Sequence, residues 1–204
     1  MDDAELLLRW RDGDRDAGEA LFERYFAALA RFFRNKVPHG VEDLVQQTFV
    51  ACIEGMHRLR SAASFRSFLF AIAHNLLRAS FRAQQRGAEP FDPEKVSAHQ
   101  LAPGPSTLFA RHGEQRLLLE ALRTIPLDAQ VLLELFYWED LTSAEIAEVM
   151  GSPHGTVRSR LRRARELLRE RLSELAASPD VLASTVQDLD GWAASLKSAG
   201  SPPG

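Results

Sequence analysis

The sequence contains a single cysteine, Cys52, and no apolar run that approaches the length of a membrane span. One cysteine excludes a disulfide within the chain, and no group of Cys and His residues has the spacing of a zinc site. The first ten residues, MDDAELLLRW, are acidic and lack the long apolar core of a secretion signal. These absences predict a cytoplasmic protein that needs no metal, cofactor or membrane insertion.

The residue combinations that enzymes use are also absent from the sequence. There is no evident pairing of a nucleophile with a base, no metal-spaced carboxylates and no glycine-rich loop that could hold a phosphate. Glu139 and Asp140 are adjacent acids at the end of a predicted helix, where a turn is the simpler interpretation. We therefore expect a binding protein without catalytic residues.

Charge is distributed unevenly along the chain, although the net charge is only −3. Residues 55–88 contain six arginines and no acidic residue, and residues 154–175 contain seven arginines and three glutamates. Attraction to phosphate is screened over about 8 Å at physiological salt, so local clusters matter more than net charge. The distribution therefore favours nucleic acid as a partner.

Apolar residues recur with the period of a helix through almost the whole chain, and no segment alternates like a strand. Residues 87–113 interrupt this pattern with four prolines and three glycines, which is typical of a flexible linker. The sequence predicts an all-α protein with an N-terminal helical bundle, residues 1–86, and a four-helix domain, residues 114–175. Residues 176–204 form a C-terminal extension.

The second predicted domain has the outline of a helix-turn-helix. Thr142 and Glu145 form a capping box, Gly151 suits the end of that helix, and Ser152 suits the start of the next. An apolar stripe that begins at Val157 should pack on the preceding helices. The opposite face carries arginines and hydroxyls that can contact bases and phosphates in a major groove. A solvated helix face without a ligand is the alternative interpretation.

The basic segment of the first domain forms a ridge on one predicted helix. His74, Arg78, Arg82 and Arg86 recur at steps of four residues, with phenylalanines interleaved. Aromatic rings beside arginines can stack on unpaired bases, although most of these rings fall on the apolar stripe and should be core. The segment is therefore a candidate surface for single-stranded DNA.

Three segments, in this order, resemble the bacterial RNA polymerase sigma factors of the extracytoplasmic-function type. VEDLVQQTFVACI (41–53) is similar to the polymerase-binding helix of that family. SFRSFLFAIAHNLLRASFR (64–82) is similar to the segment that melts and reads the −10 promoter element. LTSAEIAEVMGSPHGTVRSRLRRARELLRERL (141–172) is similar to the module that reads the −35 element.

The resemblance implies a factor that binds core RNA polymerase and directs it to promoter DNA. The implied polymerase-binding residues are Asp43, Leu44, Gln46 and Gln47. The implied −10 residues, including a loop that captures a flipped base, are Arg58, Arg60, Ser61, Ser64, His74, Asn75, Arg78 and Arg82. The implied −35 residues are His154, Thr156, Arg158, Ser159, Arg162 and Arg163, the first two through phosphates. The resemblance leaves an anti-sigma factor open as a further partner.

The alternative function is a helix-turn-helix regulator that binds duplex DNA without polymerase. It accounts for the second domain but gives no role to EDLVQQTF or to the first basic segment. Residues 176–204 lie outside the resemblance and carry apolar residues at rough helical spacing. They are expected either to pack on one of the domains and tune activity, or to form a helix without regulatory effect.

Overall fold

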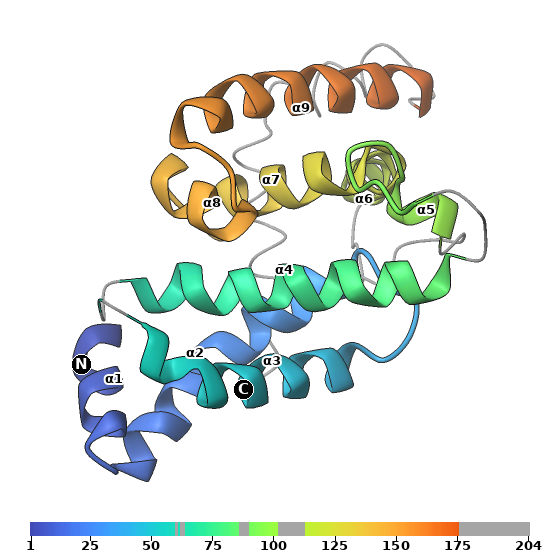
Figure 1. The fold of residues 1–204 in the computed structure, drawn as a ribbon. Helices are drawn as coiled ribbons and strands as arrows, with labels where there is room; N and C mark the ends of the chain where they lie inside the picture. The colour runs from blue at the N-terminus through green and yellow to red at the C-terminus, as the bar shows by residue number, and fades with distance from the viewer. Residues whose placement is uncertain (60, 62–63, 86–89, 102–112, 176–204) are drawn as a thin grey trace.

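The computed structural model describes residues 1–59, 61, 64–85, 90–101 and 113–175 (Figure 1). All the named elements in these ranges are helices, and the predicted all-α fold is confirmed. An isolated β-bridge between Ser97 and Pro126 also occurs there. None of the described helices combines the length and the hydrophobicity that crossing a membrane requires.

The N-terminal module, defined here as residues 1–85, contains five helical elements among its described residues. They are α1 (Asp3–Arg11), α2 (Arg15–Arg34), α3 (Val41–Gly55), the 3-10 helix η1 (Met56–Arg58) and α4 (Phe65–Gln84). A capping box of Asp2 and Glu5 begins α1, and the Asp14 side chain accepts from an amide of the first turn of α2. These caps satisfy amides that have no partner within their own helix.

Aromatic residues fill the core between α2 and α4. Phe32 and Phe33 on α2 are buried, and so are Phe70 and Phe81 on α4. The rings of Phe32 and Phe70 meet edge to face with centroids 5.7 Å apart, which is a favoured geometry for aromatic pairs. Most of the phenylalanines in the first basic segment are therefore occupied in packing α4 onto the rest of its module.

The C-terminal module, residues 90–175, contains the predicted helix-turn-helix. Its elements are α5 (Ala98–Leu101), α6 (Gly113–Thr124), α7 (Leu127–Tyr137), α8 (Ser143–Met150) and α9 (His154–Leu175). The capping box of Thr142 and Glu145 begins α8, and Gly151 ends it in the left-handed region at φ 59°. The apolar stripe that begins at Val157 is buried, as predicted, against the preceding helices.

Part of the stretch predicted as a linker is packed against the C-terminal module. The amide of Leu127 donates to the carbonyl of Val96 at 2.9 Å, and that of Asp128 donates to Pro93 at 3.0 Å. These bonds attach residues 90–101 to the start of α7, a pairing that composition alone could not predict. Residues 86–89 and 102–112 of the same stretch, and the extension 176–204, lie outside the described residues.

The two modules lie directly against each other. Figure 1 shows α4 as a layer between α7 and α8 on one side and α2 and α3 on the other, and α4 packs on both α3 and α8. Buried apolar residues form one continuous cluster that runs through both modules. Two separate small domains were predicted, so this packing is a property that only the tertiary structure reveals.

Candidate nucleic-acid and polymerase interfaces

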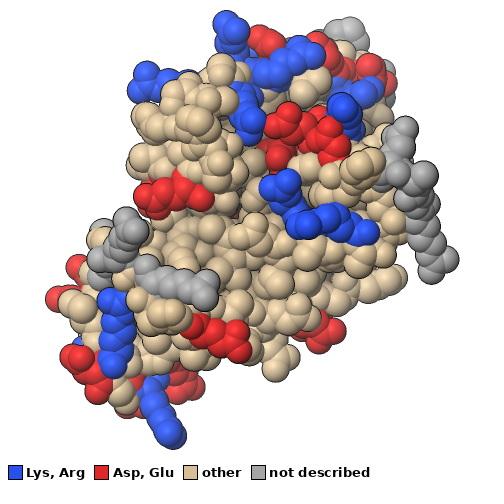
Figure 2. Space-filling view, in the orientation of Figure 1, with Lys and Arg blue, Asp and Glu red and all other residues tan. Residues whose placement is uncertain are grey.

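The exposed face of α9 gathers most of the residues predicted to read the −35 element. Arg158, Ser159, Arg162 and Arg163 are exposed on the side opposite the buried stripe. Figure 2 shows Lys and Arg side chains over the top of the molecule, with Asp and Glu side chains among them, where α9 lies in Figure 1. The geometry is that of a recognition helix whose hydrophobic face is buried and whose cationic face is open to a groove of DNA.

Arg162 and Arg163 pair with glutamates of α9 itself. Arg162 lies 3.9 Å from Glu166, and Arg163 lies 3.5 Å from Glu166 and 3.9 Å from Glu170. Such exposed pairs contribute at most about 1 kcal/mol, because water screens them. Phosphates or base edges can therefore replace these glutamates at little cost.

The N-terminal end of α9 is also accessible. His154 is exposed and Thr156 is half-buried, and the Thr156 amide donates to the Pro153 carbonyl at 2.9 Å. The first turn of a helix presents amides and a partial positive charge, both of which favour an anion. The predicted phosphate contacts of His154 and Thr156 are compatible with this position.

Two further arginines of α9 are used within the protein. Arg160 donates to Glu94 at 2.8 Å and to the Ser152 hydroxyl at 3.0 Å, and Arg165 donates to the Tyr137 hydroxyl at 2.8 Å. The sequence provided no signal for the Arg160–Glu94 pair, because the two residues lie 66 positions apart. The basic cluster thus divides into arginines that face outward and arginines that hold the module together.

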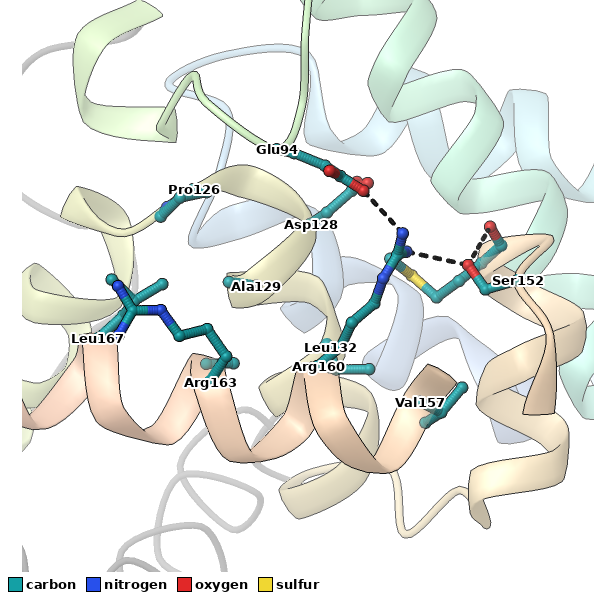
Figure 3. Close-up of a pocket in the computed structure, with 12 residues that line it drawn as sticks. Glu94, Pro126, Asp128, Ala129, Leu132, Ser152, Val157, Arg160, Arg163 and Leu167 are labelled. Carbon is teal, nitrogen blue, oxygen red and sulfur yellow. Dashed lines mark hydrogen bonds and ion pairs between the residues drawn. The ribbon is translucent and has the colours of Figure 1, made fainter. Parts of the chain in front are cut away.

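Arg160 lies at the edge of a cavity of about 160 Å³ between α7 and α9 (Figure 3). Ala129, Leu132 and Val157 contribute apolar lining, and Glu94 and Arg160 contribute charge. Figure 3 shows Arg160 reaching across toward Glu94 and Ser152. This contact connects the packed part of the predicted linker to α9.

α3 presents the predicted polymerase-binding residues on one exposed face. Asp43, Gln46 and Gln47 are exposed, and Leu44 is half-buried. The same face continues into Val50 and Ile53, which are 47% and 48% exposed although they are apolar. Neither residue was predicted from the sequence, although Val50 lies three residues beyond Gln47 and Ile53 lies three residues beyond Val50, which places both on the same face of the helix.

α4 brings only some of its predicted DNA-binding residues to the surface. Asn75 and Arg82 are exposed, and Arg78 is half-buried. His74 is only 1% exposed, and its Nε2 lies 3.2 Å from Oδ1 of Asp128 in α7. Therefore the basic ridge of α4 lies partly beneath the C-terminal module.

The loop before α4 is described only in part. Ser61 is exposed and Ser64 is half-buried beside the start of α4. The side chain of Arg58 and all of Arg60 lie outside the described residues. The proposed capture of a flipped base therefore stays a prediction from the resemblance.

Comparison with known proteins assigns both modules. Residues 21–87 match the family model of Sigma-70 region 2, and residues 115–168 match that of Sigma-70, region 4. The ECF RNA polymerase sigma-E factor of Escherichia coli strain K12 is 28% identical over 184 residues, covering 86% of this chain and 96% of that protein. The protein of the same name from Haemophilus influenzae is also 28% identical, covering 86% of this chain and 97% of its own.

Solved structures show the same fold. CnrH in complex with the cytosolic domain of CnrY superposes with a TM-score of 0.63 at 24% identity, covering 85% of this chain and 99% of CnrH. The sigma factor RpoE from Bartonella quintana, in complex with the anti-sigma factor NepR, gives 0.55 at 22% identity and covers 78% and 97%.

The alternative function, a helix-turn-helix regulator that binds duplex DNA without polymerase, is rejected because it does not explain the match to Sigma-70 region 2. The two matched regions and the relatives that span nearly the whole chain instead define a non-enzymatic polymerase subunit that directs promoter-specific transcription initiation. The chain belongs to the extracytoplasmic-function (ECF) sigma factors of bacterial RNA polymerase.

Proposed function

We propose that three surfaces divide the work of this sigma factor: α3 binds core polymerase, α4 reads the −10 element and α9 reads the −35 element. The observation that carries the proposal is the open cationic face of α9 at the end of a helix-turn-helix. Its exposed arginines pair with a glutamate of the same helix. Because such exposed pairs are weak, DNA can replace the glutamate as the partner of these arginines. The proposed domains are those expected from the sequence, residues 1–86 and 114–175.

On α9, Arg158, Ser159, Arg162 and Arg163 contact base edges or phosphates in the major groove. Arginine can bond guanine through two hydrogen bonds, and each such pair discriminates by about 1–3 kcal/mol. His154 and Thr156 hold phosphate at the helix N-terminus. The base contacts in the middle of the exposed face therefore provide sequence specificity, and the phosphate contacts at the helix N-terminus orient the protein on the DNA.

On α3, Asp43, Gln46 and Gln47 contact the polymerase, and Leu44 supports them from the half-buried edge. The exposed Val50 and Ile53 support an extension of this surface by one turn, since a polar rim around apolar residues is typical of protein interfaces. Core polymerase by itself binds DNA through charge with little choice of sequence. Docking through α3 places both DNA-reading helices on the enzyme.

On α4, His74, Asn75, Arg78 and Arg82 bind the unpaired strand of the −10 element. The loop with Arg58, Arg60, Ser61 and Ser64 captures a base that leaves the stack. Extracting a base from duplex DNA costs a few kcal/mol, and binding of the flipped base offsets part of that cost.

An anti-sigma factor is a proposed further partner. The supporting observation is that the similar RpoE of Bartonella quintana is seen in complex with the anti-sigma factor NepR. We place the protein in the cytoplasm, because bacterial RNA polymerase works there.

The test is to mix the chain with core polymerase and sequence the 5′ ends of the transcripts made from genomic DNA. Start sites that share a −10 and a −35 element are expected, and start sites without any shared element would contradict the proposal. Asp43→Arg should reduce co-purification with core at least tenfold, because it reverses a charge on the α3 face. Glu23→Arg makes the same change at an exposed position of α2 and is the matched control.

A further inference from the structure

The last residue of α1 contacts the end of the short helix η1. Nη2 of Arg11 donates to the carbonyl of Met56 at 2.9 Å and to that of Leu59 at 2.8 Å. The two carbonyls lie 45 and 48 positions further along the chain. A terminal guanidinium nitrogen has two hydrogens, so the two bonds together fix its direction. α1 is therefore tied to the point where the chain leaves η1.

The carbonyls at the end of α3 and η1 need such a partner. The last carbonyls of a helix have no donor within that helix, and a positive charge is favourable beside them. α3 has no basic residue in its last turn. Leu59 follows η1 in an extended conformation, at φ −71° and ψ 112°, and its side chain is buried. Arg11 thus supplies a donor and a positive charge from α1.

α1 is itself packed closely, so Arg11 extends from a fixed support. Two leucines of α1 are buried. Trp10 lies against the backbone of α2, where a Cβ at Gly18 would come within 2.6 Å of the indole nitrogen. The rings of Trp10 and Phe22 meet edge to face with centroids 5.1 Å apart, a favoured geometry. Close packing of this kind leaves α1 little room to shift.

The start of α4 is fixed at the same end of the molecule. The ring of Phe65 meets that of Tyr25 in α2 with centroids 5.6 Å apart, and the Tyr25 hydroxyl donates to Asp3 of α1. Phe68 packs on the end of α3, where a Cβ at Gly55 would lie 3.0 Å from its ring. Figure 1 shows α1 at the end of the molecule where α4 begins. α1 therefore supports both ends of the connection between η1 and α4.

We propose that Arg11 is a positioning residue for base capture, because it fixes the point at which the connection between η1 and α4 begins. This inference rests on the proposed function, which assigns that connection to the capture of a flipped base. It gives a role to α1, which precedes the residues matched by Sigma-70 region 2, 21–87. In this role Arg11 does not touch DNA, and it determines which base the connection accepts.

A site for a flipped base distinguishes bases only when its contacting groups are held in place. Such a site reads the edge of the base by hydrogen bonds and its faces by stacking. A displacement of about 1 Å is enough to lose these contacts. The Ser64 amide donates to the Ser61 carbonyl at 3.1 Å, and the Ser67 hydroxyl donates to the Ser64 carbonyl at 3.1 Å. These local bonds constrain the end next to α4, and Arg11 constrains the end next to η1.

A direct contact of Arg11 with a phosphate would be a different role, since the residue is exposed. Removal of a phosphate contact weakens binding about equally for all sequences and makes the affinity less dependent on salt. Removal of a positioning contact instead changes the preference among bases at one position. The two roles therefore predict different results for the same variant.

The inference is tested by transcription with core polymerase from a promoter library randomised at the −10 and −35 positions. The library is built on a promoter that start-site sequencing identifies for the wild type. The readout at each position is the ratio of transcripts with the favoured base to transcripts with the other bases. Arg11→Ala should lower this ratio about tenfold at one −10 position and leave the −35 ratios unchanged, because only the base-capture contacts are displaced.

Two further variants sharpen this test. Arg15→Ala removes the same charge at an exposed position of α2 and should keep the wild-type ratios. Arg11→Lys keeps the charge and a donor group, so it should recover most of the lost preference. Unchanged ratios at every −10 position in Arg11→Ala would overturn the inference. An equal loss for all bases, with promoter binding by the holoenzyme less dependent on salt, would overturn it too, because that result indicates a phosphate contact.

Limited proteolysis tests the anchoring without polymerase or DNA. Trypsin cleaves after arginine, and Arg58 and Arg60 flank Leu59. Cleavage after these two arginines should be about fivefold faster in Arg11→Ala than in the wild type or Arg15→Ala, because fewer contacts oppose local opening. Mass spectrometry identifies the cleavage sites. Equal rates in the three proteins would overturn the anchoring by Arg11.

Failure of this inference is distinguishable from failure of the proposed function. A wild type without base preference at any −10 position would reject the proposed role of the connection, and this inference with it. A clear preference in the wild type that persists in Arg11→Ala would reject only the role of Arg11. Circular dichroism and co-purification with core polymerase, both expected to be equal for all variants, separate these effects from unfolding.

Discussion

α4 and α9 are both long helices with arginines on one side of an apolar stripe, yet they lie in different surroundings. On α9 the Arg162 side chain is 82% exposed, and its nearest acid belongs to the same helix. On α4 the His74 side chain is 1% exposed and faces an aspartate of the other module. A basic stripe is thus an available DNA surface only when no acidic surface of the same chain covers it.

The largest effect is expected from removing exposed arginines of α9. Arg162→Ala with Arg163→Ala should reduce transcription from promoters that depend on a −35 element by about a hundredfold or more, because each lost base contact costs about 1–3 kcal/mol. Co-purification with core polymerase should stay unchanged. Run-off transcription and pull-down measure the two quantities.

The matched control for that variant is Arg169→Ala with Arg171→Ala. These arginines are exposed on the same helix but lie beyond its first three turns. Similar losses in both double variants would show that overall charge, and not the proposed contacts, is what α9 contributes.

The next effect compares a covered ion pair with an exposed one. Glu139→Ala leaves Arg31 buried without this carboxylate and should lower the free energy of unfolding by about 3 kcal/mol. Glu166→Ala removes the exposed acid beside Arg162 and Arg163 and should change it by less than about 1 kcal/mol. Urea denaturation measures the free energy of unfolding of both variants. Equal effects of the two substitutions would contradict the burial of the Arg31–Glu139 pair.

A smaller effect is expected at the turn that orients α9. Gly151 has φ 59°, and an L-residue there is strained, so Gly151→Ala should destabilise the protein by about 1 kcal/mol. Gly155 lies inside α9, where an added Cβ meets open space. Gly155→Ala should therefore be neutral or stabilising, since alanine is the better helix former. Thermal unfolding of the two variants would contradict this if both lost stability.

The smallest effect is expected at the buried thiol of the N-terminal module. Burial raises the pKa of the Cys52 thiol to about 12, so almost no thiolate exists at pH 8. Cys52 should therefore react slowly with a thiol reagent in the folded protein, and fast in urea. Equally rapid labelling with and without urea would contradict the burial of Cys52.

Local patterns were sufficient to predict much of the fold. The capping box at Thr142, the left-handed glycine at position 151 and the buried stripe from Val157 all occur where the sequence indicated them. The acid-free basic segment also forms a helix, α4, as predicted. Each depends on residues within one or two helical turns, so the sequence itself contains the information.

Contacts between distant residues were not predictable in this way. The partners Lys36 and Glu134 lie 98 positions apart, and Arg160 and Glu94 lie 66 apart. Both pairs consist of charged side chains, and charged residues are usually exposed to solvent. The hydrogen bonds from Leu127 and Asp128 to residues 93 and 96 are a further contact that composition alone does not indicate.

The sequence by itself determined the helices, the helix-turn-helix and the two basic segments, because periodicity, capping and charge are local properties of a chain. Only the tertiary structure decided which basic segment is open, since that depends on where the acids of one module lie when it packs on the other. The charges in a sequence determine what a surface can attract, and the fold determines whether other residues of the same chain already cover that surface.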